Sequence, residues 1–406
     1  MRAAFAMTLL GLITFAGPAL AEDSASPAPT IELLTMGPGE SIPERFGHAA
    51  LCVRSPERSP HDRCYDYGIF DPSEPLSLGY RFLRGESVFW VAERAYGHML
   101  RDYEHRDRDI WRQTLPLTAD QAREMAAVLE EAVEPDNRYY HYHHYFDNCS
   151  TRVRDLIDDV TGGTLSAFAA GKSDSRTFRD ITYEGFAEHF GLLIGTDVIL
   201  GRSVDVRPDV YELMFLPDEL RWGVEEALGV EAEQLYERRA PPLSRDSGLG
   251  ALPFFGLVGF ALLSMIAVAT VRRRYERAAI AIAAVPLTVM GALLWSIAIV
   301  SPLPEVRFNE LLLVFVPLDA ALPFLSRQRR LYYAAARLAG LGVVLCLALV
   351  GLFWQPVGPA LVALLPLAAI AAQSSRLRER WLPAPRGQTP QTRKQTGKHR
   401  SKVRRR

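Results

Sequence analysis

Long apolar runs in the carboxyl-terminal part of this 406-residue chain restrict what it can fold into. A helix that crosses a bilayer needs about 20 consecutive, mostly apolar residues. The candidate runs are 249–271, 278–300, 311–325, 338–354 and 357–372. The third and the fifth of them are shorter and contain prolines. The sequence therefore predicts an α-helical membrane domain of about five spans over residues 249–373.

The charges between these runs indicate how the chain crosses the membrane. The segments 272–277 and 326–337 are rich in arginine, whereas 301–310 and 355–358 carry only Arg307 between them. Segments rich in Arg and Lys stay on the cytoplasmic side of a membrane. The alternation requires an odd number of spans and places the amino-terminal part of the chain outside.

A strongly basic tail ends the chain. Residues 374–406 hold twelve Lys or Arg and one acid, a net charge of +11, so that the remainder carries −12 in a chain whose net charge is −1. A basic segment directly after an apolar run is typical of a cytoplasmic anchor on anionic lipid. We therefore expect an integral membrane protein with a cytoplasmic tail and no nucleic-acid partner.

The third apolar run is unusual because it contains polar residues. Asn309 and Glu310 lead into it, and Asp319 lies inside it between Pro317 and Pro323. An acid at membrane depth is costly and usually functional, and a helix broken by proline often lines a polar cavity. Asn309, Glu310 and Asp319 are therefore candidates for a membrane-side substrate site. A re-entrant or interfacial hairpin, with Asp319 reaching water, is an equal alternative.

The chain begins with features of an export signal. Arg2 supplies a positive charge, an apolar stretch follows, and residues 19–21 form a small-residue cleavage site. Because the apolar stretch is short for a bilayer span, a cleaved signal peptide over residues 1–21 is favoured over an uncleaved anchor helix. Residues 22–40, rich in Ser, Pro and Ala, are predicted to be a linker that begins to order at Ile31.

Residues 41–245 are predicted to form an α+β domain with a small sheet. Strands are expected at 48–54 and 64–70. Segment 88–105 mixes aromatic and charged residues and indicates a strand with irregular surface structure. The predicted helices are 118–131, 149–160, 183–190 and 217–228.

The four cysteines of the chain are too few for a disulfide scaffold. Cys52 and Cys64 lie on the two predicted neighbouring strands and are candidates for one structural disulfide. Cys346 lies inside an apolar run, which favours inert packing. Cys149 is left without an obvious structural role.

Cys149 is a candidate nucleophile because of its position. Asp147 or Asn148 can cap the predicted helix, which places Cys149 in its first turn, near free backbone N–H groups. A helix N-terminus lowers a thiol pKa, and the same N–H groups can stabilise an oxyanion during acyl transfer. The alternative is a small buried cysteine without a chemical role.

A histidine and an acid are needed to activate and orient such a thiol. His48 begins a predicted strand after Gly47 and is the first candidate base. Asp66 and Asp71 lie on or just after the next strand and are candidates for the third member of the site, although acids at strand ends are usually solvated.

A cluster of histidines precedes Cys149 in the sequence. Together with Asp147 and Cys149, His141, His143 and His144 offer enough ligands for a metal, but neither a helical i, i+4 pair nor a CxxC motif supports one. Solvated or packed histidines are therefore favoured, no cofactor is expected, and His143 stays a second candidate base.

The order of three motifs resembles a known family. They are GHAAL at 47–51, YDYGIFD at 65–71 and, after a capped helix, DNCSTRVRD at 147–155, of which the last is specific and the first is weak alone. This order is similar to that of the periplasmic domain of Lnb-type lipoprotein N-acyltransferases, which resemble permuted papain-like (NlpC/P60 and lecithin:retinol acyltransferase-like) enzymes. The resemblance continues in three later stretches, namely 175–180, 201–217 and 309–318.

The resemblance implies a membrane-bound acyltransferase in the bacterial inner membrane, with the amino-terminal domain in the periplasm. Cys149 would be the nucleophile and His48 the base, and a membrane lipid would donate an acyl group to the amino-terminal cysteine of a lipoprotein. The histidine-rich run and the basic tail depart from the family pattern. Two alternatives stay open: an NlpC/P60-like cysteine peptidase or amidase that acts on the cell wall, and a non-catalytic membrane-associated binding module.

Overall fold

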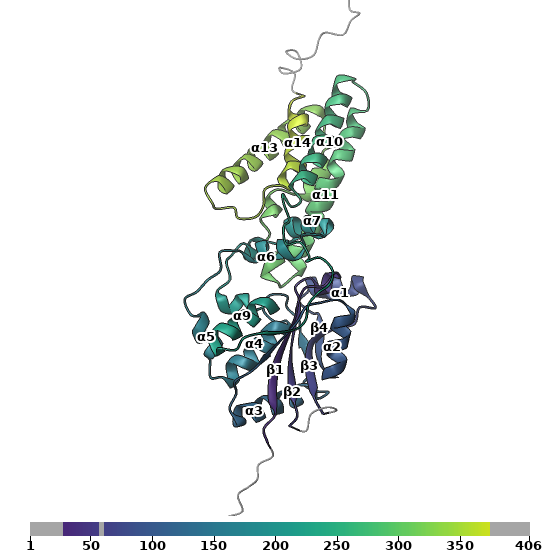
Figure 1. The fold of residues 1–406 in the computed structure, drawn as a ribbon. Coiled ribbons are helices and arrows are strands. Elements are labelled where there is room, and N and C mark those ends of the chain that lie inside the picture. Colours follow the sequence, from purple (N-terminus) through teal and green to yellow (C-terminus); the bar gives the residue numbers. More distant parts are fainter. Residues whose placement is uncertain (1–26, 57–60, 374–406) are drawn as a thin grey trace, which may run out of the picture.

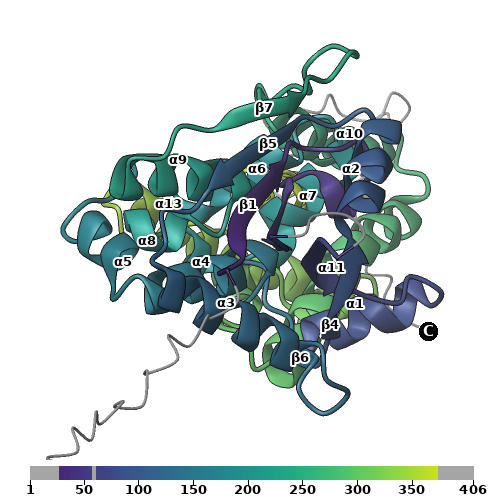
Figure 2. The same cartoon turned by 60° about the horizontal axis from the view of Figure 1, so that its bottom comes forward.

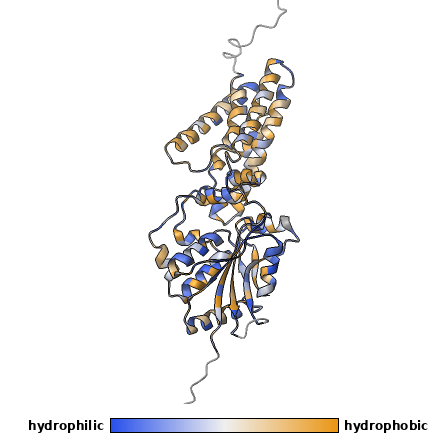
Figure 3. Cartoon of the chain, in the orientation of Figure 1, coloured by the Kyte–Doolittle hydropathy of each residue, from blue (hydrophilic) through white to orange (hydrophobic). Residues whose placement is uncertain are grey.

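The computed structural model of this chain describes residues 27–56 and 61–373, and the predicted signal peptide (1–21) and basic tail (374–406) lie outside these described residues. An α+β part comes first, and a helical part follows it along one long axis (Figure 1). Apolar residues dominate the helical part, whereas the α+β part is mixed (Figure 3).

A seven-stranded sheet, antiparallel throughout, forms the centre of the α+β part. The strand order is β6-β4-β3-β2-β1-β5-β7, with β7 and β5 towards one edge in Figure 2. The strands are β1 (Thr30–Met36), β2 (His48–Arg54), β3 (Arg63–Ile69), β4 (Val88–Ala95), β5 (Ile110–Thr114), β6 (Tyr139–His141) and β7 (Glu233–Tyr236). The α+β class predicted for this part is confirmed, with a larger sheet than expected.

The strand β1 corrects the predicted extent of the linker. Residues 22–40 were expected to be a linker, but Thr30–Met36 pairs with β2 on one side and β5 on the other, and its residues from Ile31 onward are buried. This strand lies in the middle of the sheet, where both faces are covered. Glu32 and Thr35 lie among the apolar residues of β1, so neither a continuous apolar run nor a strict alternation marks this strand in the sequence.

Helices cover both faces of the sheet. On one face of the sheet, Leu34, Ala50 and Cys52 pack against α2. Leu33 and Leu51 are adjacent to these residues in β1 and β2, and they pack on the opposite face against α3, α4 and α9. This alternation is the two-residue period of a strand. The helices of this part are α1 (Pro75–Leu83), α2 (Tyr96–His105), α3 (Ala119–Ala132), α4 (Cys149–Val160), α5 (Thr164–Ala169), α6 (Phe178–Gly185), α7 (Phe190–Ile199), α8 (Val210–Leu213) and α9 (Pro217–Leu228), with 3-10 turns η1 (Ile42–Glu44) and η2 (Arg202–Val204).

Two predictions for this part differ from the structure. The helix expected at 183–190 is replaced by the end of α6 and the start of α7, because the chain turns between Gly185 and Phe190. Segment 88–105, expected to be partly irregular, forms β4 followed directly by α2.

The helical part contains three helices long and apolar enough to cross a membrane within the described residues: α10 (Leu252–Val271), α11 (Glu276–Val300) and α13 (Arg327–Leu349). The apolar helix α14 (Ala360–Ala371) has only 12 residues. The prediction of five spans is therefore corrected to three candidate spans. The remaining pieces are α12 (Pro304–Arg307) and the 3-10 turns η3 (Glu310–Leu313) and η4 (Pro317–Ala321).

The predicted third span, 311–325, is broken into these 3-10 turns because proline cannot continue a helix. It packs closely on α11, where a Cβ at Gly291 would lie 2.8 Å from the carbonyl carbon of Val316. Asp319 is fully buried in this segment. Both of its carboxylate oxygens lie 3.0 Å from Arg337 nitrogens, and the Tyr333 hydroxyl donates to one of them at 2.8 Å. Asp319 therefore pairs with Arg337 and Tyr333 inside the protein and does not reach water.

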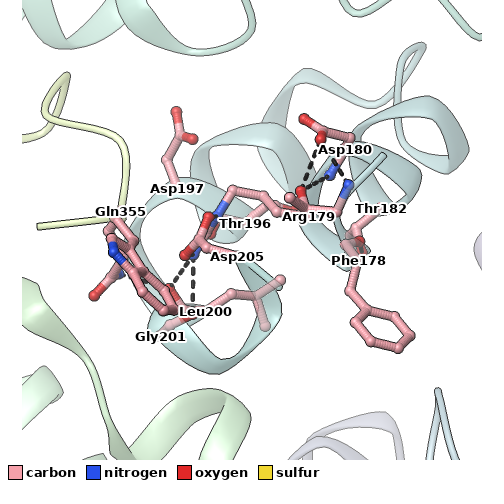
Figure 4. Close-up of polar contacts among 12 residues, drawn as sticks. Phe178, Arg179, Asp180, Thr182, Thr196, Asp197, Leu200, Gly201, Asp205 and Gln355 are labelled. Carbon is pink, nitrogen blue, oxygen red and sulfur yellow. Dashed lines mark hydrogen bonds and ion pairs between the residues drawn. The ribbon is translucent and has the colours of Figure 1, made fainter. Parts of the chain in front are cut away.

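A buried arginine organises the joint between the two parts (Figure 4). The Arg179 guanidinium donates to both carboxylate oxygens of Asp205, at 2.7 and 2.9 Å. It also donates to the carbonyls of Thr196 (2.7 Å) and Leu200 (2.9 Å), at the end of α7. Carbonyls at a helix C-terminus lack intrahelical partners, so Arg179 satisfies groups that would otherwise be buried unpaired.

Residues of the helical part bind the same loop. Asn309 donates to the Val198 carbonyl at 2.8 Å, and Gln355 donates to the Leu200 carbonyl at 2.7 Å. Glu310 accepts from the backbone N–H groups of Trp354 and Gln355. Asn309, predicted as part of a membrane-side substrate site, thus binds the end of α7, and Glu310, predicted with it, binds the backbone at Trp354 and Gln355.

Replacing Arg179 by methionine is expected to destabilise the chain by about 3–5 kcal/mol, because it leaves the Asp205 carboxylate without its partner and removes a donor from the Thr196 carbonyl. The unfolding temperature of the full chain in detergent should fall clearly. Arg207→Met, a change at an exposed neighbour, is the matched control and should leave it unchanged. Equal unfolding temperatures for the two variants would contradict this view of the joint.

Candidate active site

The turn before α4 holds Cys149 at the first helical position. The Asn148 side chain accepts from the N–H groups of Ser150 (2.9 Å) and Thr151 (3.0 Å), and the Thr151 hydroxyl accepts from the Asn148 N–H. The Asn148 amide also donates to the Phe215 carbonyl at 3.1 Å. Asn148, named above as a site residue, is thus buried and caps the helix, which fixes where the thiol lies.

A histidine and an aspartate from neighbouring strands meet beside this thiol. His48 Nε2 lies 2.6 Å from Asp66 Oδ1, and the other Asp66 oxygen accepts from Arg94 at 3.0 Å. Gly68 faces both reactive residues: a Cβ there would lie 3.6 Å from Cys149 Cβ and 3.9 Å from His48 Cε1. Gly68 has a φ of +92°, which favours glycine. Cys149, His48 and Asp66 therefore lie in one cluster around Gly68.

The electrostatics of this arrangement favour an ionised thiol. Burial alone would raise the Cys149 pKa, but the charge of His48, a hydrogen bond with His48 and the Ala49 N–H outweigh burial and lower it. Burial likewise opposes a charge on His48, yet Tyr103, Cys149 and Asp66 raise the His48 pKa well above 6.5. His48 Nε2 is occupied by Asp66, so the other ring nitrogen is left for the thiol. Both shifts favour a thiolate–imidazolium pair.

The pH dependence of Cys149 alkylation follows from these shifts. Because the thiol pKa is lowered, iodoacetamide should react at a nearly constant rate from the lowered thiol pKa upward, and the rate should fall only below it. In His48→Ala the attraction between the imidazolium and the thiolate is lost. The pH at which the alkylation rate rises should therefore move up to or beyond the ordinary thiol pKa of 9.0. Mass spectrometry over about pH 5 to 10 measures this in a Cys346→Ser background. Coincident profiles with and without His48 would contradict the ion pair.

Asp71, the other predicted orienting acid, lies elsewhere. It is exposed and accepts from the Ser73 N–H at 2.9 Å, which closes a turn after β3. Of the two predicted acids, the structure brings only Asp66 to His48.

The three histidines before Cys149 point to different surroundings. His141 is exposed, His143 lies 3.5 Å from Glu305, and His144 is packed edge-on against Phe46 and other rings. His143 Nδ1 accepts from backbone N–H groups of its own turn, so neither ring nitrogen is directed at the thiol. Among residues 27–56 and 61–373, no group of three or more possible metal ligands converges.

The fold accounts for two of the remaining cysteines, whereas the third, Cys346, is not packed as expected. Cys52 and Cys64 are paired residues on β2 and β3 and form a disulfide. Cys346 is a free, exposed residue on α13, on a helix with the composition of a membrane span.

Sequence analysis missed residues of α2 and its surroundings that support His48. Tyr103 stacks on the His48 ring, with centroids 5.9 Å apart. Arg94 holds Asp66 and also donates to Asp102 at 2.8 Å. Arg108 is buried below Tyr103 and donates to the Gly37 carbonyl at 2.8 Å. The alternation of charges and aromatics over 88–105 was the available signal, but it does not reveal which distant residue each side chain meets.

A polar cavity of about 330 Å³ opens beside His48 and gives access to the site. Its walls come from η1, from β3 and the loop after it, and from the arginines around α2, and they include Gly68, Phe70, Arg94 and Arg106. A site of this size and mixed polarity can admit the polar part of a substrate.

Comparison with known proteins gives one match. Residues 18–182 match the family model of the Lnb N-terminal periplasmic domain, and this range includes His48, Asp66 and Cys149. Neither the curated proteins nor the solved structures that were searched contain a match. The chain therefore carries an Lnb N-terminal periplasmic domain over residues 18–182, and the apolar helices that follow suggest a membrane region of an inner-membrane protein.

Proposed function

We propose that this protein is a thiol-dependent acyltransferase that N-acylates the amino-terminal cysteine of bacterial lipoproteins. The observation that carries the proposal is the half-buried Cys149 thiol at the start of α4, paired with a His48 ring that Asp66 holds in place. A lowered thiol pKa and a helix N-terminus are the features of a nucleophilic cysteine.

The proposed fold is a permuted papain-like domain. In support, the base lies on β2 and precedes the nucleophile in the sequence, while α4 packs its apolar face against β2 and β3. A fold of this kind places the thiol at the start of α4 beside β2, the strand that carries the base.

The first half of the reaction would form a thioester. The Cys149 thiolate attacks the carbonyl carbon of a membrane lipid ester, the ester C–O bond breaks, and the imidazolium of His48 gives its proton to the leaving alkoxide. The Cys149 N–H can donate to the oxyanion, because the Asn148 side chain takes the N–H groups of Ser150 and Thr151 but not this one.

The second half would transfer the acyl group to nitrogen. The α-amino group of the lipoprotein attacks the thioester carbonyl, the C–S bond breaks, and neutral His48 accepts a proton from the attacking nitrogen. This step returns the thiolate–imidazolium pair and leaves an amide. Asp66 acts as a positioning residue that keeps Nε2 occupied and so directs the other ring nitrogen to the reaction.

The membrane region favours a lipid reaction over cell-wall hydrolysis. Both substrates of the proposed reaction are held in a bilayer, and three candidate spans follow the periplasmic domain. A wall hydrolase rarely needs more than one anchor. The finding of a complete Cys149–His48–Asp66 arrangement also argues against a purely non-catalytic binding module.

A trapping experiment tests the proposal directly. The full chain in vesicles of phosphatidylethanolamine with isotope-labelled acyl chains should form a labelled adduct on Cys149 that hydroxylamine releases, as expected for a thioester. Cys346→Ser should retain the adduct, since Cys346 lies on a membrane helix. Absence of any acyl adduct on Cys149, with donor present and acceptor withheld, would contradict the mechanism.

A further inference from the structure

An apolar cavity of about 320 Å³ lies where the α+β part meets the helical part. It is separate from the polar cavity beside His48. Phe82 of α1, Phe186 after α6, several residues of α7 and the segment around Leu303 and Val306 line it, and the stretch 142–145 forms a further wall. Its volume falls at the lower end of the range of about 300–1,000 Å³ that is common for small-molecule sites.

Polar side chains of its walls form hydrogen bonds with other protein groups. The Tyr145 hydroxyl bonds to the Thr182 hydroxyl at 2.8 Å, and the Thr196 hydroxyl donates to the Leu192 carbonyl at 2.9 Å. Burial lowers the pKa of His144 to about 4, so this wall residue is uncharged. The walls thus present hydrocarbon over most of their area, which suits an apolar occupant.

One charged pair lies on the wall towards the membrane helices. His143 Nε2 and Glu305 Oε2 are 3.5 Å apart, one from the stretch before α4 and the other from α12. The two charges compensate each other when His143 is protonated. The pair connects the two parts of the protein at the rim of the cavity.

The wall formed by 142–145 leads directly to the nucleophile. The His144 carbonyl accepts from the Asn148 amide at 2.8 Å, so a hydrogen bond joins the cavity wall to the cap of α4. Tyr142 of the same wall and Cys149 pack against the same apolar core of the α+β part, and burial raises the pKa of the Tyr142 phenol. On the other side, Leu193 and Val198 of α7 pack into the core of the helical part.

We infer that this cavity holds the hydrocarbon chain of the acyl group that is transferred through Cys149. The inference rests on the proposed function. It adds that this cavity determines the length of the acyl chain that the protein accepts. An acyl chain fits for two reasons: the walls are apolar and uncharged over most of their area, and the cavity lies between membrane helices and the thiol. A chain leaving the bilayer can enter there while its ester carbonyl reaches Cys149.

Gly195 on α7 offers a direct test. It lines the cavity, and a Cβ added there would meet nothing within 4 Å, so a larger side chain can extend into the open space. Gly195→Leu should fill part of the cavity and exclude the far end of a long chain. Each methylene group that loses its burial reduces affinity roughly fourfold. The reaction of a palmitoyl ester should therefore fall at least about tenfold.

Gly191 provides the matched control on the same helix. It lies one turn earlier, does not line the cavity, and also has open space around an added Cβ. The full chain in vesicles would be treated with p-nitrophenyl butyrate or p-nitrophenyl palmitate, and acylation of Cys149 followed by intact mass. Gly195→Leu should slow only the palmitoyl reaction, Gly195→Ala should slow it less, and Gly191→Leu should slow neither.

Two outcomes would overturn the inference: an unchanged palmitoyl rate in Gly195→Leu, or an equal loss with both esters in both Gly195 variants. A wild-type chain that fails to react with either ester would instead count against the proposed function. The short ester thus separates the two ideas, because butyrate needs the thiol but not the cavity.

Discussion

Membranes that contain the Cys149→Ala variant are expected to show no acyl transfer to a lipopeptide amine, a loss on the order of 10⁵- to 10⁶-fold. Removing the nucleophile removes the thioester, and no other described residue is placed to replace it: His48 is the base, and Ser150 is fully buried in the next position of α4. The measurement follows transfer of a labelled acyl chain from phospholipid vesicles to a synthetic diacylglyceryl lipopeptide.

The folded structure should survive this change. Alanine removes only one sulfur atom from a half-buried position, and the cap formed by Asn148 and Thr151 does not involve the thiol. The variant should therefore insert in membranes in normal amount and unfold at nearly the wild-type temperature. The Cys346→Ser variant is the control for loss of a thiol elsewhere. Transfer at more than a few per cent of the wild-type rate by Cys149→Ala would mean that another group is the nucleophile.

Removal of the base has the second largest expected effect. His48→Ala should lower the transfer rate by about 10²- to 10⁴-fold, the range typical of general acid–base groups. The loss has two causes: the thiol pKa rises when the imidazolium is absent, and the leaving alkoxide no longer receives a proton. At high pH the thiol ionises without His48, so the part of the transfer rate that is lost through the raised thiol pKa should be recovered. The part that is lost because the leaving alkoxide receives no proton should not be recovered.

Asp66→Asn separates positioning from chemistry at the same site. The Asp66 carboxylate raises the His48 pKa, and Asp66 is only 1% exposed. The asparagine amide should therefore lower the His48 pKa and shift the pH profile of the transfer rate, while the Cys149 nucleophile stays intact. His141→Ala, a change at an exposed histidine of the same region, is the control and should have no effect. A pH profile of Asp66→Asn that overlays the wild type would contradict the positioning role, even if the rate fell.

The local parts of the site are predictable from the sequence. A polar cap before an amphipathic run marks the start of α4, so the place of Cys149 in its first turn follows from Asn148 and the residues after it. His48 and Asp66 lie on strands that follow each other closely along the chain, and such strands usually pair. For these reasons the sequence makes Asp66 a candidate partner of His48, but it offers Asp71 equally and does not choose between the two.

The supporting residues are not predictable in this way. Arg94 and Tyr103 reach the site from β4 and α2, and their partners depend on how the sheet orders its strands, which no local pattern encodes. Strand β1 lies inside the range 22–40 that is predicted as a linker with order only from Ile31 onward, because Ser, Pro and Ala are frequent in the residues before it. These residues become evident only when strand order and helix packing are known.

The membrane region shows the limit of counting apolar residues. The run 311–325 has the composition of a short span, but its prolines and Asp319 produce 3-10 turns that pack against α11. Asn309 and Glu310 attract attention as polar residues near a membrane, and the structure places them in the joint with α7. Hydropathy reports the environment of a segment and does not distinguish a spanning helix from a broken one.

Mass spectrometry of the amino-terminal lipopeptide of an abundant lipoprotein tests the central claim most directly. Cells that lack this chain would be compared with the same cells supplied with the wild-type chain or with Cys149→Ala. The account predicts that only the wild-type chain yields a lipopeptide whose α-amino nitrogen carries an acyl group, either as an additional chain or as one moved from the glycerol. An identical lipopeptide in all three cells would contradict it.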